Sequence, residues 1–317
     1  MIVARSITEV ARETNSVVTV GTFDGVHRAH QEIVREVVLR AKQNAGRSVV
    51  ITFDPHPKEV VASKRGPVQL LTTIDERIEL LNRQQIDLLV IIPFTYEFSQ
   101  QTSREFYERT VVGRIGVSEV VVGYDHTFGR NREGGIEELV RMGEQQNFSV
   151  FALPPFSVDG EIVSSTRVRN ALLRGEIEHA TTLLGHEYQL SGAVVVGDRR
   201  GTTLGYPTAN IRPKSDKKLV PANGVYLVGV EVEGRHYHGM MNIGVRPTLT
   251  AGLQETIEVH IFDFADDIYG ERITVSFLRK LRDEQKFASL QDLVSQLHED
   301  KAQSLKYLAK SSSPKEK

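Results

Sequence analysis

The sequence contains no cysteine among its 317 residues. This absence excludes disulfide bonds, thiolate zinc sites, iron–sulfur clusters and a cysteine nucleophile. The sequence also has almost no net charge. Its 39 lysines and arginines and 41 aspartates and glutamates give a formal net charge of −2 at pH 7. A chain without an excess of positive charge lacks the field that holds a nucleic acid by releasing its counterions, so we expect no nucleic-acid partner.

Long hydrophobic runs are missing as well. The longest, such as 88–93, are far shorter than the ~18 apolar residues that cross a bilayer. The first segment carries Arg5, Glu9 and Arg12, and these charges interrupt the apolar core that a signal peptide needs. We therefore expect a cytoplasmic protein without a membrane partner, either a monomer or a weak homo-oligomer.

The first half of the sequence alternates short β-branched runs with stretches of helical periodicity. Ala29, Ile33 and Val37 recur at helical spacing, and Thr73 followed by Glu76 forms a capping-box pattern. Such alternation is typical of βαβ units on a doubly wound parallel sheet, an α/β fold whose ligands bind at the carboxyl ends of the strands near the switch in strand order. The expected strands are 17–20, 48–53, 87–92, 119–122 and 148–153.

After about residue 188 the pattern changes to strands separated by clusters of Gly, Pro, Asn and Asp, without intervening helices. This favours an antiparallel β-barrel or sandwich, followed by one amphipathic helix over 290–305. The expected strands are 189–196, 224–232, 236–241, 256–264 and 271–278. Because the preceding helix pattern ends at Gly185, we predict an α/β domain at 1–186, a β-barrel domain at 187–310 and a disordered polar tail at 311–317.

The segment 20–30 leads from a strand into a helix and contains two histidines. Gly21 and Gly25 allow a tight turn, and the N–H groups at the start of a helix attract anions. His27 and His30 are three residues apart, so they share a helix face and can donate together to a phosphate during its transfer. A zinc pair is one alternative, but no third ligand stands at a matching spacing. Surface histidines without a role are the other.

Hydroxyl groups stand directly before two arginines at 164–169. Ser165, Thr166 and Arg167 at a helix start are suited to the β- and γ-phosphates of a nucleotide. A simple helix cap explains either Ser165 or Thr166, but it does not explain the arginines.

The second half holds a segment rich in Gly and Pro, 201–210, which is not a P-loop because the GK[ST] ending is missing. It could serve only to shape a barrel loop. Thr208 and Asn210, however, offer two neutral oxygen ligands of the kind that Mg²⁺ accepts beside phosphate and water. On an alternating strand, Glu258 and His260 point to the apolar-facing side. Glu258 is therefore either a partnered charge or a general base.

These motifs carry a family resemblance. The runs GTFDGVHRAH, ITFDPHP, GYDHTFG and SSTRVR occur in this order, and they resemble the adenylyltransferase module of bacterial bifunctional riboflavin kinase/FAD synthetases, which has the HxGH signature of nucleotidyltransferases. The PTAN run at 207–210, Glu258 before an H-x-x-D-F stretch, and the loops 221–226 and 242–248 are similar to the flavokinase half. The resemblance implies an HxGH-type α/β domain followed by a six-stranded flavokinase barrel.

The resemblance also implies two activities and their cofactors. The second domain would phosphorylate riboflavin to FMN with MgATP, and the first would transfer AMP from ATP to FMN, giving FAD and pyrophosphate. The neutral alcohol of riboflavin benefits from a basic carboxylate, whereas the phosphate of FMN is already an anion. In the first domain, the resemblance implies His27 and His30 at the transferring phosphate and Asp24 beside ATP or its Mg²⁺. The other residues that it implies at this ATP are Gly21, Phe23, Ser165, Thr166 and Arg167. The residues that it implies at the flavin are Asp125, Phe128 and Arg246. In the second domain, it implies Thr208 and Asn210 at Mg²⁺ and the second ATP, and Glu258 as the base.

Alternatives stay open at this point. The segment 124–129 can be a Gly-rich turn whose Phe128 packs inward. Ala29 stands where the HxGH signature has Gly, so a weakened first site would leave a riboflavin kinase alone. A flavin-binding protein without turnover is a second alternative. An RNA-binding relic of a tRNA ligase is a third, which the charge of −2 disfavours.

Overall fold

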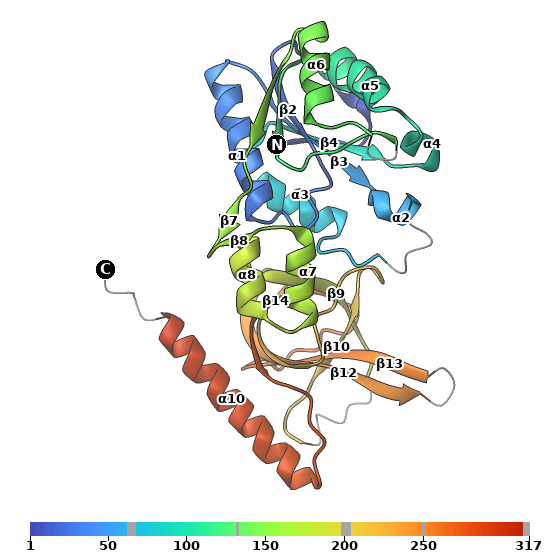
Figure 1. The fold of residues 1–317 in the computed structure, drawn as a ribbon. Coiled ribbons are helices and arrows are strands. Elements are labelled where there is room, and N and C mark those ends of the chain that lie inside the picture. Colours follow the sequence, from blue (N-terminus) through green and yellow to red (C-terminus); the bar gives the residue numbers. More distant parts are fainter. Residues whose placement is uncertain (62–67, 131–132, 198–203, 249–251, 313–317) are drawn as a thin grey trace. The chain divides into compact units, whose positions relative to one another are not determined.

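The computed structural model contains two compact units, Met1–Ser165 and Thr166–Lys317. Most contacts of each unit lie within that unit. Both are drawn as ribbons in Figure 1. The described residues are 1–61, 68–130, 133–197, 204–248 and 252–312, with the backbone alone at 246–248, 252–255 and 311–312.

The first unit is built on a six-stranded parallel sheet in the order β1-β4-β3-β2-β5-β6. Its strands are β1 (Ile2–Ala4), β2 (Ser16–Val20), β3 (Ser48–Asp54), β4 (Leu88–Pro93), β5 (Val117–Gly123) and β6 (Ser149–Leu153). A two-stranded hairpin follows, made of β7 (Ser157–Val158) and β8 (Glu161–Ile162). The helical segments are η1 (Ile7–Glu9), α1 (Arg28–Gln43), α2 (Pro57–Val61), α3 (Ile74–Asn82), α4 (Tyr96–Ser99), α5 (Ser103–Phe106), the π-helix η2 (Tyr107–Ile115) and α6 (Ile136–Gln146).

The strand order contains a switch beside β2. The chain adds β3 and β4 on one side of β2, and it later adds β5 on the other side. The loops after β2 and β5 therefore diverge at the carboxyl edge of the sheet, which is the usual ligand crevice of a doubly wound fold. The five expected strands are confirmed as β2, β3, β4, β5 and β6, and their predicted first and last residues lie within two positions of the observed ones. The sequence does not predict β1, because its three residues are too few to show a periodicity.

The sheet is covered on both faces, which is why its central strands read as continuous apolar runs. Every residue of β2 is buried. Helix α1 packs on β2 and β3 and buries Val34, Val37 and Ala41. The capping box expected at the start of α3 is confirmed, because Thr73 Oγ1 accepts the Glu76 N–H and the Glu76 carboxylate accepts the Thr73 N–H.

The second unit contains a closed barrel with the strand order β10-β13-β12-β11-β14-β9, and every neighbouring pair is antiparallel. The strands are β9 (Tyr188–Val195), β10 (Ala209–Pro213), β11 (Gly224–Val232), β12 (Arg235–Thr248), β13 (Gly252–Ile261) and β14 (Arg272–Arg282). The expected barrel is confirmed. β10 is absent from the expected strands because it starts inside the Gly- and Pro-rich segment, which reads as a loop.

Within the described residues, the helices grouped with the barrel are α7 (Ser165–Leu173), α8 (Ile177–Leu184) and α10 (Leu290–Ser312). Helix α10 packs on β12 and β14. It is fixed by a bidentate ion pair in which Arg282 Nε and Nη2 donate to the Asp300 carboxylate at 3.0 and 2.9 Å. Asp300 is 1% exposed. Loss of Arg282 would leave the buried Asp300 carboxylate without its cation.

Helix α8 contacts β9 and β14 and ends at Gly185, which has a φ of 77°, as the sequence predicts. The contacts therefore group α8 with the barrel, and the functional boundary at 186 stays a prediction. The end of the predicted tail, 313–317, lies outside the described residues. Within the described ranges, every helix is too short or too polar to span a bilayer. Cytoplasmic localisation and the oligomeric state remain predictions from the sequence.

Candidate active sites

The loop between β2 and α1 is a tight turn that is anchored by its neighbours. Gly25 has a φ of 85° and donates its N–H to Thr72 Oγ1 at 3.0 Å. The Gly21 N–H is bound by the Ile51 carbonyl at 3.0 Å. Phe23 adopts a φ of 48° with its ring 2% exposed, a conformation that persists in a non-glycine residue only when the surroundings hold it. The turn therefore presents the start of α1 in a fixed direction.

His27 and His30 lie together at the start of α1, as their spacing predicts. His27 is the N-cap residue, and its Nδ1 accepts the His30 N–H at 3.4 Å. The two rings are stacked, with centroids 3.6 Å apart and planes 14° apart. His27 is 4% exposed, whereas His30 is half-buried. Two imidazoles beside the N–H groups of a helix start form a donor cluster that suits a phosphate.

The Asp24 carboxylate faces the segment before α3. It is 1% exposed and accepts the Leu71 N–H, the Thr72 N–H and the Thr72 hydroxyl at 3.0, 3.0 and 3.2 Å. A carboxylate with this many donors holds the turn in place. These contacts give Asp24 a structural role, and the role at ATP or Mg²⁺ that the resemblance implies stays a prediction.

A buried arginine that the sequence pattern does not reveal supports this loop. Arg77 on α3 is 2% exposed and donates to Thr52 Oγ1 at 3.1 Å, while the Thr52 hydroxyl donates to the Thr22 carbonyl at 3.0 Å. Burial lowers the pKa of Arg77, and the negative charges of Asp24 and Asp54 oppose this change. A basic residue in an amphipathic helix usually faces water. Only the fold shows that this one lies behind the loop.

The motif of hydroxyl groups and arginines forms the start of α7. Ser165 begins the helix, and its Oγ donates to the Asp24 carbonyl at 3.1 Å. Thr166 and Arg167 follow in the first turn and are exposed. The structure therefore links Ser165 to the loop after β2, while phosphate binding by Thr166 and Arg167 stays a prediction.

The segment after β5 holds the residues that the resemblance assigns to the flavin. Asp125 is exposed. Phe128 is only 9% exposed, and its ring packs on Tyr107 and His126 with centroid separations of 4.5 and 5.1 Å. Burial lowers the pKa of His126 to about 4, so this ring is neutral at pH 7. Phe128 packs inward in this structure, and its predicted contact with a flavin stays untested.

Three other aromatic rings are half-buried near the carboxyl ends of β3 and β4. Phe53 is the next-to-last residue of β3, Phe94 follows β4, and Phe98 lies on α4. The ring centroids are 5.5 Å apart for Phe53 and Phe94, and 5.4 Å apart for Phe94 and Phe98. Such rings offer a surface for stacking at the ligand edge of the sheet. The sequence pattern does not reveal them, because a Phe beside a strand normally belongs to the core.

Strand register assembles the second site. Asn210 of β10 pairs with Glu258 of β13, and Glu258 pairs with Asn242 of β12, so the three side chains share one face of the sheet. Thr208 stands just before β10, and its Oγ1 donates to Glu258 Oε2 at 3.2 Å. The structure thus brings together the residues that the sequence singles out and adds Asn242. Arg246 lies farther along β12, where its side chain is outside the described part of the chain.

His260 stands two residues beyond Glu258 on the same face. Its Nδ1 lies 2.8 Å from the Pro207 carbonyl oxygen. The ring contacts Tyr206 and Phe262 with centroid separations of 5.0 and 5.8 Å. Burial lowers the pKa of His260, and the hydrogen bond to the Pro207 carbonyl opposes this change. The expectation that Glu258 and His260 share one side is confirmed, because they contact consecutive residues of the neighbouring segment.

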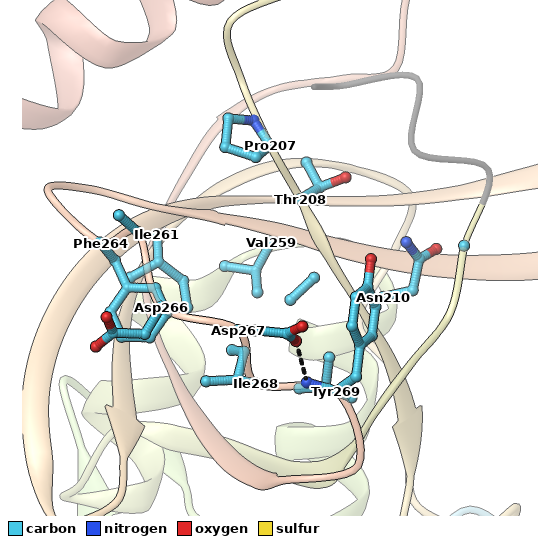
Figure 2. Close-up of a pocket in the computed structure, with 14 residues that line it drawn as sticks. Pro207, Thr208, Asn210, Val259, Ile261, Phe264, Asp266, Asp267, Ile268 and Tyr269 are labelled. Atoms are coloured by element: carbon cyan, nitrogen blue, oxygen red, sulfur yellow. Dashed lines mark hydrogen bonds between the residues drawn. The ribbon is translucent and has the colours of Figure 1, made fainter. Parts of the chain in front are cut away.

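A pocket of about 200 Å³ lies beside these residues (Figure 2). Asn210 and Tyr269 line one side of it, and Phe264 lines the other. Val259 contributes to the apolar wall, and Thr208 stands at the polar edge. Pockets with apolar walls and a few polar groups are the usual form of a small-molecule site. The part of the lining that follows β13 carries no sequence signal that marks it in advance.

Two family models match the chain, one for each site. The model described as FAD synthetase matches residues 9–167, and the model described as riboflavin kinase matches residues 184–308. Together with the parallel sheet and the closed barrel, they define a class of enzyme that joins a nucleotidyltransferase domain to a flavokinase domain.

Similar proteins cover nearly the whole chain. A Pseudomonas fluorescens protein is 38% identical over 90% of this chain and 91% of its own length. A Listeria monocytogenes protein is 35% identical over 94% of both chains, and an Escherichia coli protein is 36% identical over 92% of both. All three are described as bifunctional riboflavin kinase/FMN adenylyltransferases. A crystal structure from Streptococcus pneumoniae, described as a macrolide-efflux protein, is 34% identical with a TM-score of 0.85 over 95% of this chain and 97% of its own.

The chain belongs to the family of bifunctional riboflavin kinase/FMN adenylyltransferases. It phosphorylates riboflavin to FMN and adenylylates FMN to FAD. The family resemblance seen in the sequence is therefore confirmed, and the alternatives of a kinase alone or a flavin-binding protein are not favoured.

Gly197→Ala should impair riboflavin phosphorylation without unfolding the barrel. A Cβ at this position would lie 2.1 Å from Asn210 Nδ2, so the amide must turn away, and misplacing a ligand-positioning group by about 1 Å can cost ~10²-fold in rate. The measurement is the initial rate of FMN formation, with the melting temperature as a check on folding. Gly229→Ala on β11 is the matched control, since its Cβ would meet only Ser276 at 3.7 Å. Equal kinase rates in the two variants would contradict this assignment of Asn210.

Proposed function

We propose that Glu258 is the general base of the riboflavin kinase site. The observation that carries this proposal is the contact between the Glu258 carboxylate and Thr208 Oγ1 at 3.2 Å. Thr208 also lines the pocket. The ribityl hydroxyl oxygen attacks the γ-phosphorus of ATP, the bond from that phosphorus to the bridging oxygen breaks, and ADP leaves. Glu258 takes the proton of the hydroxyl, which would otherwise be a weak nucleophile.

The same cluster fits a bound Mg²⁺. The Thr208 hydroxyl and the Asn210 carbonyl are neutral oxygen donors, which Mg²⁺ accepts alongside phosphate and water oxygens. The Asn210 amide packs closely against Gly197, and this contact restricts how it can turn. Thr208 and Asn210 would hold Mg²⁺, and the bound metal would neutralise part of the charge on the transferring phosphate.

The pocket suits the base of the same nucleotide. Phe264 and Tyr269 supply aromatic surface, on which a purine can stack. Thr208 and Asn210 also line it, so a nucleotide with its base inside would extend its phosphates towards the proposed base and metal ligands. We therefore assign the pocket to ATP of the kinase reaction.

For the adenylyltransferase site, we propose that His27 and His30 stabilise the transferring phosphate. A phosphate oxygen of FMN attacks the α-phosphorus of ATP, and pyrophosphate leaves. Because the attacking oxygen already carries negative charge, the reaction needs alignment and hydrogen-bond donors rather than a strong base. The stacked histidines and the N–H groups of α1 supply such donors. Ser165, Thr166 and Arg167 would hold the β- and γ-phosphates.

The flavin of this site would bind at the carboxyl edge of the sheet. Asp125 is exposed there and can accept a hydrogen bond from FMN. The half-buried rings of Phe94 and Phe98 offer a more accessible surface for the isoalloxazine ring than Phe128 does, because Phe128 is 9% exposed.

Glu258→Gln should lower the rate of riboflavin phosphorylation by ~10²–10⁴, the usual effect of losing a general base. Glutamine keeps the size of the side chain and can still accept the Thr208 hydroxyl, but it is not basic. The measurement is FMN formation from riboflavin under conditions where chemistry limits the rate. Glu231→Gln, an exposed position on β11, is the control. Near-normal turnover in Glu258→Gln would remove Glu258 from the role of base.

The double change His27→Ala and His30→Ala should abolish FAD formation from FMN and spare FMN formation from riboflavin. Removing one donor to a developing negative charge typically costs ~10²–10³ in rate. Both activities are measured on the same purified chain, and the melting temperature of the chain checks the folding of the unit that carries the histidines. Arg28→Ala, at an exposed position between the two histidines, should keep both activities. A folded double variant that loses both activities equally would point to a structural role for the histidines.

A further inference from the structure

We propose that His260 is a positioning residue of the kinase site, which aligns Thr208 by holding the Pro207 carbonyl. The inference rests on the proposed role of Thr208 at the phosphates of ATP. His260 would act through the backbone of the segment before β10, because its ring nitrogen contacts the Pro207 carbonyl oxygen.

The backbone ladder alone does not fix this segment. Pairing between β10 and β13 begins at Ala209 opposite Val259, so Pro207 and Thr208 stand before the first rung. The side chains of β13 reach beyond the ladder instead. Glu258 accepts the Thr208 hydroxyl at 3.2 Å, and His260 contacts the Pro207 carbonyl at 2.8 Å. Two consecutive residues are thus held by two side chains from one face of one strand.

The contact of His260 has a defined direction. A carbonyl oxygen can only accept a hydrogen bond, so His260 Nδ1 carries the proton and donates it. The imidazole ring is kept in place by edge contacts with Tyr206 and Phe262, both of which are buried at 7% and 4% exposure. The donor is therefore oriented before any ligand arrives.

Holding the Pro207 carbonyl has a consequence for Thr208. The Pro207 carbonyl and the Thr208 N–H belong to one planar peptide group, so the direction of the carbonyl sets the plane from which Thr208 departs. The ring of Pro207 fixes its φ, which leaves the rotation of this peptide plane as the main freedom of the segment. The hydrogen bond from His260 removes that freedom and presents the Thr208 hydroxyl to the phosphates.

Three substitutions of His260 separate hydrogen-bond donation from packing. His260→Asn places an amide N–H where Nδ1 stands, His260→Gln places its amide near Nε2, and His260→Phe keeps a ring without a donor. We expect His260→Phe and His260→Gln to raise the KM for MgATP in riboflavin phosphorylation about 3- to 10-fold, the range of one lost hydrogen bond. His260→Asn should stay within about 2-fold of the wild type, and kcat should change less than KM in all three.

The measurement is made on the full chain, with the melting temperature as the check on folding of the barrel that carries His260. His260→Phe at the wild-type KM would overturn the proposal, and so would an equal rise in His260→Phe and His260→Asn, since that result would assign the effect to ring packing. If His260→Phe does not fold, the comparison of His260→Asn with His260→Gln decides alone.

A parallel Thr208→Val variant separates this proposal from the one on which it rests. If Thr208→Val leaves the KM for MgATP unchanged, the assignment of Thr208 to the nucleotide fails and the role of His260 fails with it. If Thr208→Val raises the KM while His260→Phe and His260→Gln do not, only the role of His260 is overturned.

Discussion

The pairing of β10 with β13 is the constraint on which the kinase site depends. This register puts Asn210 opposite Glu258, and a shift by one residue would turn one of the two side chains to the other face. The proposed metal ligand and the proposed base come from segments about 50 residues apart in the chain, and they meet only through this ladder. The contact between Thr208 and Glu258 extends the same register beyond the end of β10.

The adenylyltransferase site is organised by a different constraint. Its parallel sheet changes strand order beside β2, so the loop after β2 is held at the open crevice with the N-terminal end of α1. Buried polar groups fix this loop: Asp24 binds three donors, and Arg77 stands behind it. The roles proposed for the two sites differ as the chemistry requires, because an anionic nucleophile needs donors and alignment whereas an alcohol needs a base.

Much of the fold follows from the sequence, because burial on both faces gives apolar runs and amphipathic helices give a clear period. Candidate site residues that stand in contiguous motifs, such as His27 and His30, can be proposed from the sequence because their spacing alone places them together. Arg77, Phe94 and Phe98 cannot, because their significance depends on packing between segments far apart in the chain. The motif that contains Phe128 suggests a flavin contact, but the sequence does not show how exposed this ring is. In the structure the ring is nearly buried against Tyr107.

If the chain carries two separate sites linked by the intermediate FMN, two variants that each lack one site should complement each other. The test is to mix the His27→Ala/His30→Ala variant with the Glu258→Gln variant, supply riboflavin and MgATP, and separate the flavins by chromatography. Alone, the first variant should stop at FMN and the second should leave riboflavin largely unreacted. The mixture should form FAD, since each variant retains the site that the other lacks. A mixture that stops at FMN, although the Glu258→Gln variant adenylylates added FMN, would contradict the account.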